Sequence, residues 1–135
     1  MSLRSSVTIG PISIFFTNVN TAMGIPGHSH FAEVIVEFQN LGPIGWPSFG
    51  STNALIEIAL RSECQKAFRD CTNEDVVMRL WNVVHAIVQN RDDNAILKEW
   101  GGAYILRKLE LRVRGVPDKI GHDDGFTTYT VERND

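Results

Sequence analysis

A long polar turn near the end of the chain carries two side chains that could move protons. Lys119 and His122 lie in the segment from Gly115 to Gly125, which joins two strand-like stretches. Histidine changes charge near neutral pH, so His122 has the chemistry of a proton shuttle, with Asp123 and Asp124 beside it. The structural alternative is that Lys119 and His122 are solvated turn residues. The sequence alone leaves both interpretations open.

Two histidines form a second candidate group. In Gly27-His28-Ser29-His30-Phe31 they are separated by one residue, at the start of a predicted strand. Alternate residues of a strand project from the same face, so His28 and His30 could reach one metal ion. Two histidines alone make a weak zinc site. We therefore predict no bound metal and no cofactor, and keep a site at His28 and His30 as the alternative to solvated loop residues.

An acidic residue lies near the start of the second of two predicted helices. Thr72-Asn73-Glu74-Asp75 has the pattern of a capping box, with Thr72 as the N-cap. Glu74 then lies in the first turn, where an acid favours the helix dipole by a few tenths to about 1 kcal/mol. This stabilising role is the structural interpretation of Glu74, and a role in ligand binding is the functional one.

The chain as a whole predicts one soluble domain spanning residues 1–135. Of its 135 residues 43% are hydrophobic, and the formal net charge is -3. There is no basic stripe, which argues against a nucleic-acid partner, and no apolar run of ~20 residues that would span a membrane. Neither an apolar leader nor a disulfide framework is evident in a chain with 2 cysteines. These features predict buried or idle thiols and a cytoplasmic location.

Hydrophobic periodicity predicts four strands and two helices. Alternation of apolar residues indicates strands at 7–16 and 30–38, with a possible interruption at Gly10-Pro11, and a turn over 17–27. A loop over 40–50 holds Trp46 and Phe49, which we expect to contact the core or a neighbouring subunit. The remaining elements are helices from about 51 to 68 and 72 to 90, followed by strands at 109–114 and 126–133.

The helices are expected to be buried along specific faces. The first should use Leu55, Ile58 and Ala59. The second should use the stripe Val77, Leu80, Trp81, Val84, Ile87 and Val88. The element order predicts an α+β fold in which a four-stranded antiparallel sheet carries both helices on one face. The open face and edges of such a sheet favour a homo-oligomer.

The C-terminal hairpin resembles that of the dihydroneopterin aldolase family. The resemblance is carried by Val116-Pro117 followed by Ile120-Gly121-His122, and by a last strand that ends in Val131-Glu132-Arg133. The segments Gly27–Phe31 and Ser51–Leu55 are similar to that family's second-strand entry and first-helix start. The resemblance implies the tunnelling fold, with element order ββααββ. It further implies a tetramer or octamer whose sites lie between subunits.

The resemblance also implies a ligand and a reaction. In that family an acid at the position of Glu74 grips the pterin ring, because a carboxylate can accept both hydrogen bonds from an amidine-like N–H pair. Thr72 and a neighbouring subunit's Asn53 would complete the site for a pterin or purine-like ligand. The implied reaction is retro-aldol cleavage or epimerisation of 7,8-dihydroneopterin, without metal or Schiff base, and Lys119 and His122 would be its acid–base groups.

Departures from the family pattern keep two alternatives open. The family lysine is replaced by Val116, its tyrosine by Ala54, and its first-hairpin glutamate is absent. A non-catalytic pterin- or purine-binding oligomer is therefore one alternative. The other is an enzyme similar to 6-pyruvoyltetrahydropterin synthase, which is suggested by His28-Ser29-His30 and Thr72-Asn73-Glu74. The third zinc histidine of that family falls near Asn20, and the N-terminal half holds no cysteine nucleophile.

Overall fold

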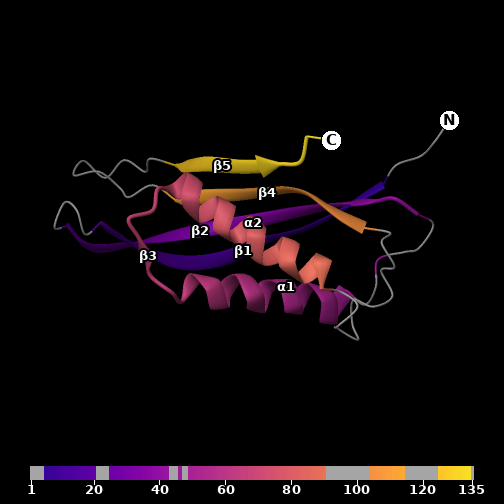
Figure 1. Cartoon of the computed structure of the whole chain (residues 1–135), viewed down its shortest axis with the longest axis horizontal. Helices are drawn as coiled ribbons and strands as arrows, with labels where there is room; N and C mark the ends of the chain where they lie inside the picture. Colours follow the sequence, from indigo (N-terminus) through magenta and orange to yellow (C-terminus); the bar gives the residue numbers. More distant parts are fainter. Residues whose placement is uncertain are drawn as a thin grey trace.

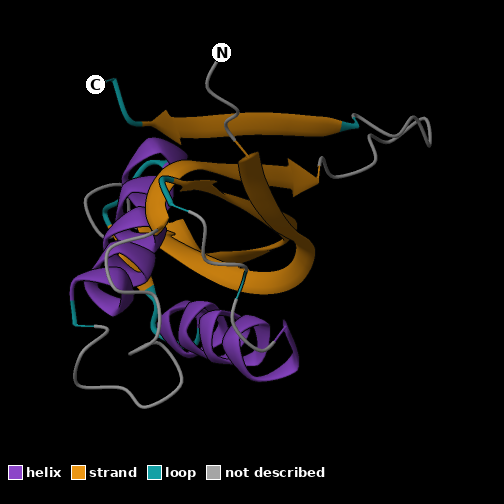
Figure 2. Cartoon of the chain, turned by 90° about the vertical axis from the view of Figure 1, so that its right-hand side faces the viewer, coloured by secondary structure: helices purple, strands orange, loops and turns teal. Residues whose placement is uncertain are grey.

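A computed structural model describes residues 5–20, 25–42, 46, 49–90, 104–114 and 125–134, without the side chains of residues 20, 25–28 and 49. The strands form one curled sheet, and both helices pack along it (Figures 1 and 2). The elements are β1 Ser5–Asn20, β2 Ile25–Asn40, α1 Phe49–Cys64, β3 Phe68–Arg69, α2 Asn73–Gln89, β4 Tyr104–Arg114 and β5 Phe126–Glu132.

The sheet confirms the predicted α+β architecture and adds one short strand to it. Its strand order is β3-β1-β2-β4-β5, and the pairs β1–β2, β2–β4 and β4–β5 are antiparallel. The prediction of four antiparallel strands is therefore correct for the main elements. It omits β3, a two-residue strand that pairs in parallel with Asn18 and Val19 of β1.

Alternation along the strands places one apolar face against the helices. The buried face includes Ile12, Ile14, Phe16, Ala32, Val34, Val36, Phe38, Leu109, Leu111 and Val113. The strands predicted at 7–16 and 30–38 thus each bury one alternating set of side chains, as their apolar alternation requires. In α2 the predicted stripe is also confirmed: Val77, Leu80, Val84 and Val88 are buried, and Trp81 and Ile87 pack against the core.

The predicted face of α1 is correct only in part: Leu55 packs against the core, but Ile58 does not. Ile58 is 66% exposed, whereas Ile56 and Leu60 are fully buried. The buried stripe follows a four-residue spacing from Thr52 to Cys64. The helix also ends at Cys64 and not at residue 68, because the chain turns there to place Phe68 in β3.

Phe68 anchors this turn in the core. Its side chain is fully buried, and its ring meets that of Phe16 edge-on at a centroid distance of 5.8 Å. The Arg79 guanidinium lies 4.3 Å from the centre of the same ring. Arg79 also pairs with Glu63 of α1 at 2.7 Å, and this hydrogen bond is the main cause that lowers the pKa of Glu63. The α1–α2 connection is thus held by apolar and ionic contacts together.

The first hairpin is longer than predicted. Most of the expected turn over 17–27 is strand, since β1 continues to Asn20 and β2 begins at Ile25. The predicted interruption at Gly10-Pro11 is confirmed as a break in register between Ile9 and Ile12. Gly10 has φ +122°, and a Cβ there would lie 2.6 Å from the Val34 carbonyl oxygen. Only glycine therefore fits at this bulge.

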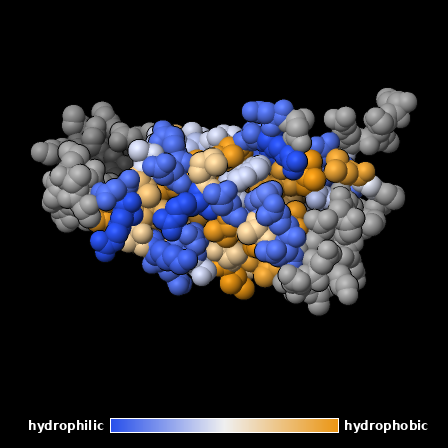
Figure 3. All heavy atoms as spheres, viewed as in Figure 1, coloured by the Kyte–Doolittle hydropathy of each residue, from blue (hydrophilic) through white to orange (hydrophobic). Residues whose placement is uncertain are grey.

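The helix side of the molecule presents a mixed surface. Hydrophilic residues cover much of it, with hydrophobic residues between them (Figure 3). In the described ranges, no helix is long and apolar enough to cross a membrane.

Candidate functional site

The apolar side of the sheet becomes polar at one end, next to the start of α2. The last aromatic pair is Phe16 and His30, which face each other across β1 and β2 with ring centroids 5.3 Å apart. His30 is half-buried, so its prediction as a solvated loop residue is wrong. One step further along β1, Asn18 lies opposite His28.

A chain of side-chain hydrogen bonds joins three elements at this polar end. Asn18 Nδ2 donates to Asn73 Oδ1 at 3.1 Å, and Asn73 Nδ2 donates to the Tyr129 hydroxyl at 3.2 Å. These hydrogen bonds link β1 and β5, the outer antiparallel strands, through the first residue of α2. Asn18 Oδ1 is buried and has no hydrogen-bond partner. The start of α2 is therefore fixed in a polar setting.

The capping box at the start of α2 is confirmed. Thr72 Oγ1 accepts a hydrogen bond from the Asp75 backbone N–H at 3.2 Å, and Asp75 Oδ2 accepts one from the Thr72 N–H at 2.9 Å. Asp75 thus supplies the reciprocal carboxylate. Glu74 takes no part in this cap and is exposed in the first helical turn, next to Asn73. Its carboxylate can meet a ligand without breaking the cap.

Asn53 lies at the opposite end of the molecule from Glu74. Asn53 Oδ1 accepts a hydrogen bond from Trp46 Nε1 at 3.2 Å. The Trp46 ring packs 5.3 Å from that of Phe38 and 5.0 Å from that of Tyr104, which confirms that Trp46 holds its loop to the core. The start of α1 and the start of α2 are far apart in Figure 1. Asn53 and Glu74 of one chain therefore cannot contact the same small ligand.

The remaining predicted site residues are only partly described. Lys119 and His122 lie in the segment 115–124, outside the described residues, so their roles stay predictions. The backbone of His28 belongs to β2, but its side chain is also outside the description.

The positions facing the two histidines do not complete a zinc site. Asn18 lies opposite His28, Phe16 lies opposite His30, and neither supplies a usual zinc ligand. Asn20, where a third histidine was sought, lies opposite Ile25. Among the described side chains, no three of His, Cys, Asp and Glu are grouped to hold a metal. Among the described side chains no third ligand accompanies the two histidines, and we derive no metal-dependent step.

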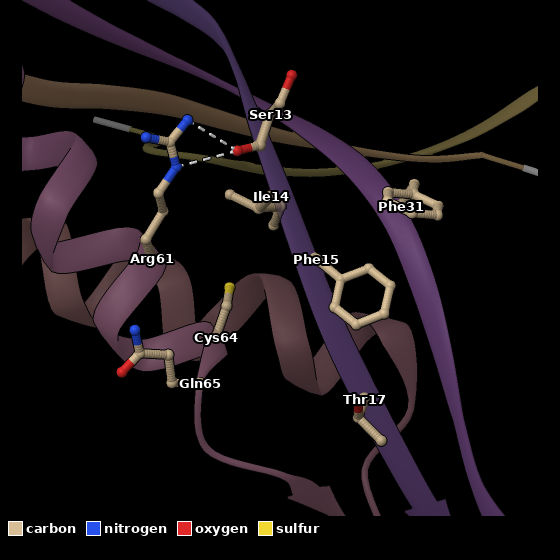
Figure 4. Close-up of a pocket in the computed structure, with 8 residues that line it drawn as sticks. All are labelled: Ser13, Ile14, Phe15, Thr17, Phe31, Arg61, Cys64 and Gln65. Carbon is tan, nitrogen blue, oxygen red and sulfur yellow. Dashed lines mark hydrogen bonds between the residues drawn. The ribbon is translucent and has the colours of Figure 1, made fainter.

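A pocket of about 560 Å³ lies along the outer edge of β1, where it faces α1 (Figure 4). Its lining is Ser13, Ile14, Phe15, Thr17, Phe31, Arg61, Cys64 and Gln65. Burial raises the pKa of the Cys64 thiol to about 11, so it is a neutral thiol at physiological pH and no nucleophile. The buried, unbonded Cys64 agrees with the predicted idle thiols. Periodicity gave no signal for this pocket, because it depends on how α1 packs beside β1.

Comparison with known proteins identifies the fold. No family model and no curated protein matches the sequence. The solved 6-pyruvoyl tetrahydropterin synthase from Plasmodium vivax matches with TM-score 0.54 and 12% identity, over 98% of this chain and 99% of that chain. The Plasmodium falciparum synthase matches with TM-score 0.52 and 7% identity, over 96% of this chain and 99% of that chain.

The chain has the tunnelling fold. At these identities the likeness concerns the arrangement of the elements and not the site. The two matched structures are both synthases, and what the match shows is the fold that both sequence resemblances imply. The resemblance to the aldolases stays a prediction.

Proposed function

We propose that this protein binds a pterin or a similar purine-like ring through Glu74 and acts on it as a lyase. The observation that carries the proposal is the start of α2 in a tunnelling fold. There Glu74 is exposed, lies outside the capping box, and directly follows Asn73, the middle member of the hydrogen-bonded series Asn18, Asn73 and Tyr129. A carboxylate in this position can accept both hydrogen bonds from the N–H edge of the ring. Backbone groups near Thr72 would support the same edge.

The reaction we favour is of the aldolase type, on 7,8-dihydroneopterin. A base removes the proton from a side-chain hydroxyl, the adjacent C–C bond breaks, and the protonated ring accepts the electrons. Epimerisation follows the same path when the bond re-forms on the other face. Lys119 and His122 are the proposed acid–base groups. The Tyr129 hydroxyl, which accepts from Asn73, adds a proton-bearing group at this end of the described chain.

The two outer antiparallel strands have matching edges, which supports a homo-oligomer. In β1, the carbonyl of Val19 accepts from Asp70 N–H at 2.7 Å, outside the β1–β2 pair. In β5, the Arg133 N–H donates inward to the Arg107 carbonyl at 2.9 Å. Hydrogen bonding alternates along antiparallel strands. Odd residues of β1 after the bulge and even residues of β5 therefore direct their backbone groups outward.

These edges permit a closed ring of subunits. β1 and β5 run in opposite directions, because the three pairs between them are antiparallel. The outward-directed residues of both strands also carry side chains on the open face. β5 of one subunit can therefore continue the sheet at β1 of the next, in a head-to-tail ring. We propose a tetramer or octamer, in which a neighbour's Asn53 approaches Glu74.

A synthase-like reaction is the second candidate. It is favoured by the two matching solved structures, which are both synthases, and by the placement of His28 and His30 at alternate positions of β2. Because the described side chains offer no third ligand, we expect elemental analysis of the purified protein to find no stoichiometric zinc. About one zinc per chain, lost on His28→Ala, would place the synthase reaction first.

Titration calorimetry with neopterin and with guanine tests the proposed function. We expect saturable binding of one ring per chain, and release of a small aldehyde when 7,8-dihydroneopterin is supplied. Binding without turnover would favour the non-catalytic oligomer, as the replacements Val116 and Ala54 suggest. Failure of both rings to bind at millimolar concentration would overturn the proposal.

A further inference from the structure

One stretch of the β1 edge is covered by a side chain and not by a strand. In the described chain, β3 pairs with β1 only at Asn18 and Val19. Ser13, Phe15 and Thr17 precede this pairing and have the same parity as Val19, so their backbone groups also point outward. The ring centroids of Phe15 and Phe31 are 4.9 Å apart, and the Thr17 and Ser29 hydroxyls are 2.8 Å apart. Such close side chains are expected for non-hydrogen-bonded antiparallel pairs. This edge is the wall of the pocket in Figure 4.

Arg61 occupies the start of this edge. Its Nε and Nη2 both donate to the Ser13 carbonyl oxygen, each at 3.2 Å. Figure 4 shows the guanidinium reaching from α1 to the strand. A neighbouring strand that extended the sheet here would direct a backbone N–H to the same oxygen. The arginine and an added strand therefore compete for one acceptor.

We propose that Arg61 is a displaceable cap on the β1 edge. In the isolated subunit it blocks strand pairing at the Ser13 carbonyl oxygen. On assembly it leaves that oxygen to a backbone N–H of β5 from a neighbouring copy. The inference rests on the ring assembly proposed above and adds a regulatory residue to it. The strand that fits this edge is β5. Its even residues, like the odd residues of β1, direct their backbone groups outward and carry side chains on the open face. Exposed edges are commonly protected by charged side chains, which prevents uncontrolled pairing.

The local contacts allow the Arg61 guanidinium to leave the β1 edge and still keep an ion-pair partner. Arg61 also pairs with Glu57 one helical turn away, and both side chains are substantially exposed. When β5 takes the Ser13 carbonyl, the guanidinium keeps Glu57 and gains water. The pocket beside it then has room for side chains of the incoming strand, since it holds about 560 Å³ between Phe15 and α1.

Removing the cap should strengthen assembly. We expect Arg61→Ala to lower the dissociation constant for subunit association roughly 10-fold, because two hydrogen bonds from a charged donor no longer oppose pairing. Mass photometry and sedimentation over a concentration series measure this constant. Lys66→Ala is the matched control: it also removes one exposed positive charge near the end of α1, but Lys66 pairs with Glu63. It should leave the constant unchanged.

A labelled peptide with the sequence of residues 126–132 provides a second readout on the same full-length proteins. It should bind Arg61→Ala more tightly than wild type or Lys66→Ala. If wild type assembles and Arg61→Ala assembles equally or more weakly, the cap is wrong and the proposed ring stands. If neither protein assembles at any concentration and neither binds the peptide, both the cap and the edge-to-edge ring are overturned.

Discussion

Replacing Glu74 with glutamine is expected to weaken neopterin binding roughly 10- to 150-fold. The substitution removes a charged acceptor and introduces an amide with one acceptor and one unwanted donor. A hydrogen bond to a charged group is worth ~1.5–3 kcal/mol, which corresponds to that range of affinity. Calorimetric titration of wild type and Glu74→Gln measures it directly. Equal affinity of the two proteins would remove Glu74 from the site and with it the main support for ring binding.

The neighbouring acid provides a matched control for this prediction. Asp75 lies one residue further along the same helical turn, but its carboxylate is bonded to Thr72. Asp75→Asn should therefore cost stability by about 1 kcal/mol through the cap, with little loss of ring affinity. Glu74→Gln should instead lower ring affinity, while its stability loss, a few tenths to ~1 kcal/mol for an exposed first-turn acid, should be no larger than that of Asp75→Asn. Thermal melts beside the titrations separate these two effects.

Replacing Phe68 with alanine is expected to lower the free energy of unfolding by about 3–5 kcal/mol. The fully buried ring contacts Phe16 edge-on and carries the Arg79 guanidinium on its face, so its loss leaves a cavity and removes the cation–π contact. Urea unfolding at equilibrium measures the change. Phe126→Ala is the comparison, because that ring is 53% exposed and its loss should cost far less. Similar losses in the two variants would contradict the anchoring role of Phe68.

Local patterns in the sequence predicted the central parts of the four main strands and the start of α2, but not the strand ends: β1 and β2 extend into the expected turn, and β4 begins at Tyr104 and not at residue 109. A strand buried on one face must alternate, so Ile12, Ile14 and Phe16 determine which way β1 faces. The N-cap at Thr72 depends only on a residue three positions away. In α1 apolar residues occur on more than one face, as Ile56 and Ile58 illustrate. Packing against the sheet decides which face is buried, and the local periodicity of the helix does not reveal that packing.

The candidate site was harder to predict because its contacts are distant in sequence. Asn18 and Asn73 are 55 positions apart, and Asn73 and Tyr129 are 56 apart. No periodicity connects such residues. β3 was missed for a similar reason: two residues are too few to form a pattern, and they pair with a part of β1 that looked like a turn. The resemblance to pterin enzymes indicated Glu74 and Thr72, but not the amide chain beside them.

The change from apolar to polar side chains at Phe16 and His30 has a consequence for how this protein can evolve. Apart from Phe68, which pairs with Asn18, the fully buried side chains of β1 and β2 lie on one side of that boundary, and half-buried polar groups such as Asn18 and Tyr129 lie on the other. Substitutions at the polar end can therefore accumulate at small cost to folding, and new ligands can be selected on an unchanged scaffold. The match to solved structures at 7% and 12% identity shows that very different sequences can form this fold.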